Sequence, residues 1–350
     1  DGHGSLDHYF FQMRHEAALD FGAASDHDHA EETPDRLWNL ALRKTAEHHV
    51  EGEFVTLSGY EYAKWRRDGD GDRNVYYRGA GGPLFRSNDD DCPHPPDLFA
   101  ALGETEAIII PHHPAHGGNF CDYKDHDPRR ERLIEIFQCR GGYECPAEQG
   151  NPVPEMTSAE PVDAGWVHRA LALGWRVGFT GGGDDHWAQA GTEFPVRWFI
   201  RQDSPYKAGL MAVQAEKLTR DGIWRAMWER RVTATTGARI LIDFTLNGRP
   251  MGSELAAAED ASLNRRRRIR ATAHGLAEIE RVEVLRSGEV AYAIRPDSPD
   301  ATLDWTDETP LADCSLPAAT WCDHPFCYYY VRAVQADGEV AWASPIWIDT

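Results

Sequence analysis

Five short apolar segments of this chain each end beside side chains that bind metal ions. The segments span residues 19–25, 54–60, 107–111, 133–138 and 177–183. The polar residues that follow them are Asp26, His27 and Asp28; Glu61; His112 and His113; Cys139; and Asp184, Asp185 and His186. Apolar runs of this length are typical of strands buried on both faces, as in a mostly parallel sheet or barrel. The carboxyl ends of such strands meet at one rim, so we expect these side chains to gather there and bind divalent metal ions.

Length and charge restrict the class of protein. A chain of 350 residues exceeds one ordinary core, which favours two domains. The formal net charge of −21 argues against binding to nucleic acid or to an anionic membrane surface. The sequence contains no run of about 18 apolar residues, so it predicts no transmembrane helix. The start at Asp1 without an initiator Met indicates a shortened chain, so its cellular location stays open.

The pattern of predicted elements changes near residue 237. Residues 1–236 alternate strand-like runs with helical patterns, which is typical of βα units. The expected helices cover residues 6–19, 34–42, 96–102 and 166–173, with a further helix capped by Thr219. Residues 237–350 show β-branched, alternating runs separated by turns such as Asn247-Gly248. We therefore expect a barrel domain followed by a small antiparallel β-sandwich.

Each candidate ligand also has a structural explanation. Asp184 and His186 are two apart in an extended segment and can face one ion, but they also suit a Gly-rich turn. His112 can be a ligand or a hydrogen-bonded structural histidine, and His27 can be a ligand or part of a turn before a helix. Glu61 can bridge two metals or lie on the surface. Their joint occurrence at the ends of separate strands favours the metal site.

The seven cysteines contain no CxxC pair, which excludes a zinc ribbon or a thioredoxin-type motif. Cys322 and Cys327 could form a disulfide in an exported protein, although burial as free thiols is the commoner state.

The ordered motifs resemble those of the PHP (polymerase and histidinol phosphatase) superfamily. They are Ser25-Asp26-His27-Asp28, Gly59-Tyr60-Glu61, Gly71-Asp72-Arg73-Asn74-Val75, Pro111-His112-His113 and Gly183-Asp184-Asp185-His186. Residues 230–237 and 341–347 further resemble the branch of that superfamily with a C-terminal β-sandwich. The resemblance implies a distorted (β/α)7 barrel, up to three Zn, Mn or Fe ions, and hydrolysis of phosphate esters. It also implies five metal ligands: His27, Glu61, His112, Asp184 and His186.

Two departures from the family pattern affect the metal site. Family members open with an HxH strand followed by Asp-Gly, and only Asp1-Gly2 stands here, so that strand is expected to be absent and Asp1 is a weak candidate ligand. Asp72 stands where some relatives have a histidine, and a carboxylate there suits Mn or Fe. Glu135 and Cys139 are weaker candidates.

The expected mechanism is metal-assisted hydrolysis of a small phosphate ester. Glu61 would bridge metals roughly 3.5–4 Å apart, Arg73 or less favourably Arg140 would bind phosphoryl oxygens, and His113 would protonate the leaving group. Two alternatives remain open. The same cluster could hydrolyse an amide or a lactone, or the barrel could have lost its chemistry while the β-sandwich binds a glycan or a protein.

Overall fold

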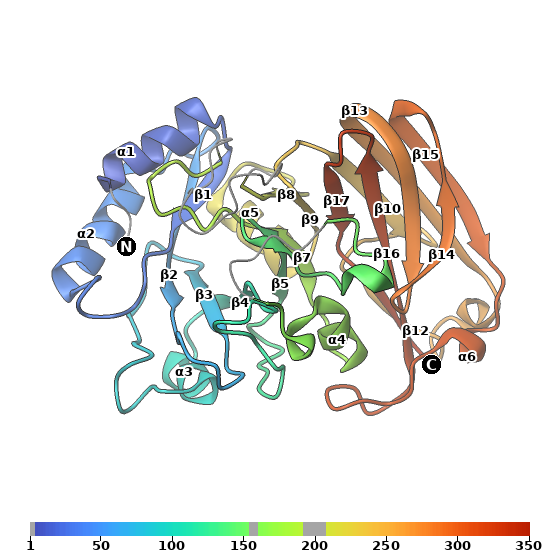
Figure 1. Ribbon diagram of the computed structural model, residues 1–350, viewed down its shortest axis with the longest axis horizontal. Coiled ribbons are helices and arrows are strands. Elements are labelled where there is room, and N and C mark those ends of the chain that lie inside the picture. The colour runs from blue at the N-terminus through green and yellow to red at the C-terminus, as the bar shows by residue number, and fades with distance from the viewer. Residues whose placement is uncertain (1–3, 154–159, 192–207) are drawn as a thin grey trace.

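The computed structural model describes residues 4–153, 160–191 and 208–350 and is a mixed α/β structure dominated by sheet (Figure 1). The helices are α1 (Leu6–Phe11), α2 (Asp35–His48), α3 (Pro95–Leu102), α4 (Val167–Ala172), α5 (Arg220–Trp228) and α6 (Leu311–Cys314). A π-helix (Gln12–Glu16) extends α1, and 3-10 helices span Ala147–Gln149, Asp163–Gly165 and Ala261–Asn264. Within these ranges, no helix is long and apolar enough to cross a membrane.

The strands form three sheets. Those of the first 236 residues are β1 (Phe21–Ala24), β2 (Val55–Tyr62), β3 (Asp72–Tyr77), β4 (Ala107–His112), β5 (Leu133–Gln138), β6 (Gly141–Gly142), β7 (Gly178–Gly181), β8 (Leu210–Val213) and β9 (Val232–Thr235). The others are β10 (Leu241–Leu246), β11 (Arg249–Pro250), β12 (Glu254–Ala256), β13 (Arg267–Arg286), β14 (Glu289–Ile294), β15 (Ser298–Asp307), β16 (Phe326–Gln335), β17 (Val340–Ala343) and β18 (Ile346–Asp349).

The first sheet has the order β1-β2-β3-β4. The sequence led us to expect a mostly parallel sheet, but this sheet is not. Only β1 and β2 are parallel; β3 runs antiparallel to both β2 and β4. The nine residues between β2 and β3 are too few for the helical crossover that parallel neighbours need, so the chain turns back on itself. The expectation failed because β3 has a polar sequence and was not recognised as a strand.

A closed (β/α)7 barrel is not shown by this topology. Strands β6, β5 and β7 form a separate three-stranded sheet, and no ladder among the described residues joins it to β4. Strands β8 and β9 belong to the eleven-stranded sheet that also contains β10 and β17. The boundary expected between residues 236 and 237 therefore falls inside one hydrogen-bonded sheet.

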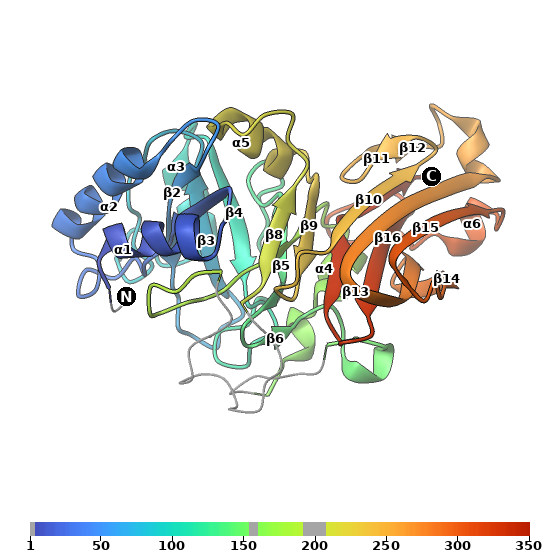
Figure 2. The ribbon, with the colours of Figure 1, turned by 90° about the horizontal axis from the view of Figure 1, so that it is seen from above.

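The C-terminal residues form a large curled sheet that is antiparallel apart from the β12–β18 pair (Figure 2). Strand β13 is 20 residues long and pairs with β10, β14, β15 and β16. The two runs expected as separate strands at 268–273 and 279–285 are parts of this one strand, which bends where its register shifts.

Two helix ends lie where the sequence placed them, although α1 is shorter than expected and α2 is longer. The hydroxyl of Thr219 accepts a hydrogen bond from the Gly222 amide at 2.9 Å, which caps α5. Helix α3 ends at Gly103, whose φ of 51° is left-handed.

The two halves share one apolar core. Trp166, Trp175 and Phe179 pack in the same cluster as Tyr330 and Trp342 of the curled sheet. Burying side chains of this size contributes roughly 1.5–3 kcal/mol each, so the two halves stabilise each other.

A buried polar network crosses the same contact. The carboxylate of Glu144 accepts hydrogen bonds from Arg332 Nη1 at 2.7 Å, from Trp342 Nε1 at 2.9 Å and from the hydroxyl of Tyr330. Arg332 is also paired with Glu283, 2.7 Å away. We call these five residues the Glu144 network.

Candidate metal centre

Backbone pairing brings the expected strand ends together. The segment after β1 continues alongside β2, where His27 and Glu61 form a parallel bridge. The amide of Asp28 donates to the Glu61 carbonyl and the amide of Glu61 to the Asp26 carbonyl, both at 2.9 Å. These bonds fix the imidazole of His27 and the carboxylate of Glu61 on the same edge of the sheet.

Four side chains from four regions of the chain face one another at this edge. Glu61 Oε2 lies 3.7 Å from His27 Nε2 and 3.8 Å from His112 Nε2. His112 Nε2 is also 3.7 Å from Asp184 Oδ2. These separations exceed hydrogen-bond length, so the facing donor atoms do not satisfy one another.

His113 turns away from the strand that carries His112. Its φ of 32° is left-handed, and Nε2 comes within 3.5 Å of Asp72 Oδ2. Asp72 is fully buried and also accepts hydrogen bonds from the Lys64 amide at 2.6 Å and from the side chain of Asn119. Glu61, His112 and His113 each offer a ligand atom within 4.8 Å of the others. We call Glu61, Asp72, His112, His113 and Asp184 the imidazole–carboxylate cluster.

Two further carboxylates orient the histidines. Glu135 Oε2 lies 2.8 Å from His112 Nδ1 and accepts a hydrogen bond from the His113 amide at 2.7 Å. Glu32 Oε2 lies 2.6 Å from His27 Nδ1. A carboxylate on the far nitrogen of an imidazole fixes its tautomer and directs the other nitrogen, which is the usual arrangement behind a metal-binding histidine.

Three side chains contact the carboxylate of Asp184. Its φ of 51° follows the glycines at 181–183, and its carboxylate contacts His186 Nε2 at 3.0 Å, Gln138 Nε2 at 2.9 Å and the guanidinium of Arg140. Arg140 is a cation in direct contact with the cluster.

Burial and crowded charges shift the pKa values of these groups in opposite directions. Burial alone would lower the pKa of His112, but Glu135 and Glu61 outweigh it and raise this pKa to about 10. Burial and the neighbouring His112 hold the pKa of His113 well below its usual range. Burial and Glu61 raise the pKa of Asp72 to about 7. Burial opposes ionisation of Asp184, yet Arg140 lowers the pKa of Asp184 well below its usual range.

The donor set suits divalent cations. It combines imidazole nitrogens with carboxylate oxygens, the ligands that Zn, Mn and Fe share in proteins. Two ligands about 2.1 Å from a common ion lie roughly 3–4 Å apart, which matches the separations around Glu61. In the described part of the chain, Nδ1 of His113 and Nε2 of His116 are buried without a hydrogen-bond partner. Such atoms are costly to bury unless a ligand is bound.

Some expected residues lie elsewhere. The guanidinium of Arg73 is 2.9 Å from Glu131 and contacts the Asp70 and Gly71 carbonyls, so this side chain does not reach the cluster, contrary to our expectation. Asp1 lies outside the described residues. Cys139 is buried, and its burial raises the pKa of the thiol well above its usual range.

The sequence analysis did not identify Glu32 or Asn119, and it ranked Glu135 low. Glu32 stands five residues after His27 in an acidic turn, which was a usable local signal. Asn119 meets Asp72 across 47 positions and left no local signal.

Two other groups of potential ligands already hold cationic side chains. Asp70 is 3.0 Å from Lys124 and 3.3 Å from Lys64. Asp349, near Cys322 and His324, is 2.5 Å from Arg176. These cations neutralise the carboxylates, and neither group has the acidic excess of the imidazole–carboxylate cluster.

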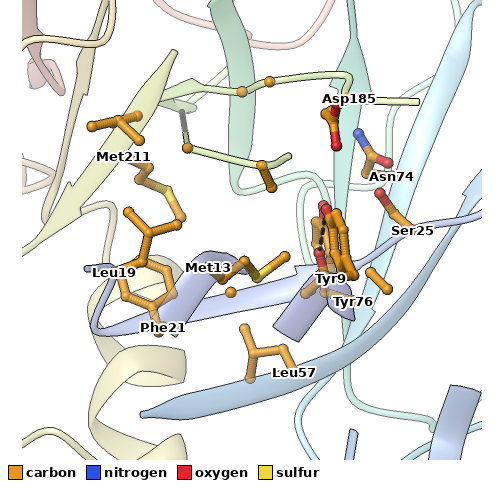
Figure 3. Close-up of a pocket in the computed structure, with 18 of the residues that line it drawn as sticks. Tyr9, Met13, Leu19, Phe21, Ser25, Leu57, Asn74, Tyr76, Asp185 and Met211 are labelled. Atoms are coloured by element: carbon orange, nitrogen blue, oxygen red, sulfur yellow. Dashed lines mark hydrogen bonds between the residues drawn. The ribbon is translucent and has the colours of Figure 1, made fainter. Parts of the chain in front are cut away.

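A cavity of about 1170 Å³ opens beside the cluster (Figure 3). Met13, Leu19, Phe21, Leu57 and Met211 form its apolar part. Strands β1 and β8, which border it, are each at the end of their sheet.

The chain is similar to several known proteins. It matches the family described as "Protein of unknown function (DUF3604)" over residues 5–152. It is 31% identical over 339 residues to an uncharacterized protein of Chlamydia pneumoniae, covering 96% of this chain and 53% of that protein. It is also 31% identical over 353 residues to an uncharacterized protein of Chlamydia muridarum, covering 100% of this chain and 55% of that protein. The chain thus spans about half the length of the curated relatives it matches.

One solved structure is similar over most of the chain. It is a two-domain protein from Bacteroides vulgatus described as containing a predicted PHP-like metal-dependent phosphoesterase, with a TM-score of 0.44 and 11% identity. The match covers 91% of this chain and 89% of that one. A likeness this distant does not establish a shared site.

Proposed function

We propose that this chain is a metal-dependent hydrolase that acts on small phosphate esters. The observation that carries the proposal is that His112 Nε2 lies 3.8 Å from Glu61 Oε2 and 3.7 Å from Asp184 Oδ2, which is close but beyond hydrogen-bond length. Buried groups that face one another in this way are expensive unless a cation joins them.

His27, Glu61, His112, Asp184 and His186 would hold divalent cations, with Asp72 as a further carboxylate ligand. Such cations lower the pKa of a water molecule towards neutrality and stabilise charge on a phosphoryl group. Glu135 and Glu32 keep the imidazoles of His112 and His27 in position.

Arg140 takes the role that the sequence analysis gave to Arg73. Its guanidinium touches Asp184 and would bind the non-bridging oxygens of a phosphate ester. Lys in place of Arg140 keeps the charge but loses the fork of donors, whereas Gln loses both. We expect Arg140→Gln to lower kcat/KM by about 100-fold and Arg140→Lys to lower it less.

His113 and Asp72 together would supply the proton for the leaving oxygen. Their side chains are 3.5 Å apart. Asp72 would hold the imidazole of His113 in position through this contact, and His113 would give the proton to the leaving oxygen.

Metal analysis followed by a substrate panel tests the proposal. The purified protein should contain at least one equivalent of Zn, Mn or Fe, and should hydrolyse phosphomonoesters or phosphodiesters in a reaction that a chelator stops and added metal restores. Less than one metal per chain, or turnover confined to amides and lactones, would contradict it.

A further inference from the structure

Helix α6 lies at the end of the molecule farthest from the first sheet (Figure 1), and its last residue and a residue of β16 are cysteines. Cys314 ends α6, and Cys327 is in β16. The segments that carry them are joined by hydrogen bonds in both directions between the backbones of Leu316 and Phe326, at 2.7 and 3.1 Å. The hydroxyl of Ser287 contacts both cysteines, donating to the Cys314 carbonyl at 3.0 Å and to Cys327 Sγ at 3.4 Å.

The two thiols are free, and both cysteines lie beside the hydroxyl of Ser287, but their surroundings differ. Cys327 is fully buried, whereas Cys314 is partly exposed. Of the seven cysteines, all of which the structure describes, Cys314 alone is not buried. An oxidant in solution can therefore reach Cys314 most easily.

Charged side chains around Cys314 favour its thiolate. Arg267 Nη2 lies 3.9 Å from Cys314 Sγ, and Arg286 is nearby. Asp307 pairs with both arginines, at 3.1 and 2.7 Å, and accepts a hydrogen bond from Tyr329. Two cations thus face one carboxylate. The interaction with Cys327, and then the charges of Arg267 and Arg286, lower the pKa of Cys314 to about 6. Burial and the charge of Asp307 act in the opposite direction.

Other cysteines of the chain have raised pKa values. Burial raises the pKa values of Cys92 and Cys121 to about 12 and about 11, and of Cys145 to about 12. The hydrogen bond to Cys314, together with burial, raises the pKa of Cys327. Thiolate chemistry at neutral pH should therefore start at Cys314.

We propose that Cys314 and Cys327 form a redox-sensitive pair that closes into a disulfide when a peroxide oxidises Cys314. The Cys314 thiolate attacks a peroxide oxygen, the O–O bond breaks, and a sulfenic acid and hydroxide form. The Cys327 sulfur then attacks the Cys314 sulfur, the S–O bond breaks, and water leaves with the Cys327 proton. Two thiols lose two electrons and one peroxide gains them.

The disulfide would fasten α6 and the following loop to β16 without involving the imidazole–carboxylate cluster. Closing this short loop restricts the unfolded chain and should raise the melting temperature of the curled sheet. The inference is independent of the proposed hydrolase activity.

The full chain treated with one equivalent of hydrogen peroxide tests the pair. Intact mass should fall by two hydrogen atoms, and peptide mapping should find Cys314 linked to Cys327. Cys327→Ser should stop at a sulfenic acid on Cys314 that dimedone traps, and Cys314→Ser should leave Cys327 reduced. Cys322→Ser, the matched control, should behave as wild type.

Alkylation gives a second reading that does not depend on disulfide geometry. Iodoacetamide should modify Cys314 before every other cysteine, with a rate that rises through about pH 6. Preferential oxidation of another cysteine, a linkage other than 314–327, or slow alkylation of Cys314 at pH 7 would overturn the proposal.

Discussion

Two buried polar groups of this protein are built in opposite ways. The Glu144 network has one carboxylate with three hydrogen-bond donors, and its Arg332 is shared with Glu283. The imidazole–carboxylate cluster brings three carboxylates, with Glu135 behind them, against two histidines and Arg140. Its facing atoms lie 3.5–3.8 Å apart, and His113 Nδ1 has no hydrogen-bond partner within the described residues.

The difference separates a structural group from a binding group. Buried charges that are fully paired can hold two halves of a protein in one arrangement. Buried charges that are crowded and incompletely paired cost stability, and such arrangements are typical of functional sites. If this comparison is correct, substitutions in the two groups should affect different properties of the protein.

The largest effect is expected for Glu61→Gln. The neutral amide cannot bind cations as the carboxylate does, so metal content should fall and turnover should drop by more than about 1,000-fold. Because the substitution also removes a charge from a crowded site, the metal-free variant should be at least as stable as the metal-free wild type. Metal analysis, activity and urea unfolding of the same preparations measure all three. Undiminished activity would remove Glu61 from the proposed site.

The pH dependence of stability offers a second test, for the metal-free protein. Asp72 has a pKa of about 7 in the folded chain and about 3.9 when unfolded. Because the folded chain binds this proton more tightly, the contribution of Asp72 is complete below about pH 4 and is lost as the pH rises to about 7. The loss amounts to at most about 4 kcal/mol.

Comparison with Asp72→Asn isolates this contribution. Unfolding free energies of wild type and variant are measured from pH 4 to pH 7 with a chelator present. That of wild type should fall relative to that of the variant as the pH rises, because the amide of Asn cannot ionise. A constant difference across this range would assign the raised pKa to another group.

Glu144→Gln should have the reverse effect of Glu61→Gln. The amide leaves Arg332 with one carboxylate instead of two and loses hydrogen bonds made to a buried charge, which should cost about 3 kcal/mol of unfolding free energy. Metal content and kcat should stay at wild-type values. Loss of metal from this variant, measured under folded conditions, would show that the two groups are not separate.

The sequence predicted the strand ends of the candidate site better than the connections between strands. The apolar runs that became β2, β4 and β5 are each buried along their whole length, so their signal was strong. Strand β3 was missed because Asp72, Arg73 and Asn74 are polar, although the structure buries all three. Their burial depends on partners such as Glu131 and Asn119, which lie more than 40 positions away in the chain.

The Glu144 network could not have been predicted from local patterns. Residues 141–160 are rich in glycines, prolines and acids, a composition that is typical of a loop. Glu144 is instead fully buried because its partners come from β16 and β17, nearly 200 positions later. Long-range pairing of this kind leaves no spacing in the sequence.

The smallest effect is expected for Tyr330→Phe, which probes the Glu144 network at its edge. The hydroxyl of Tyr330 donates to Glu144 and contacts His168 Nε2 at 2.7 Å. Its loss leaves the carboxylate with the donors of Arg332 and Trp342, so the unfolding free energy should fall by about 1.5 kcal/mol, half the effect of Glu144→Gln. Chemical denaturation of both single variants and of the double variant gives the coupling between them. The double variant should be less destabilised than the sum of the single variants, because both substitutions weaken the same hydrogen bond. Strict additivity would mean that the hydroxyl of Tyr330 stabilises the fold through His168 and not through Glu144.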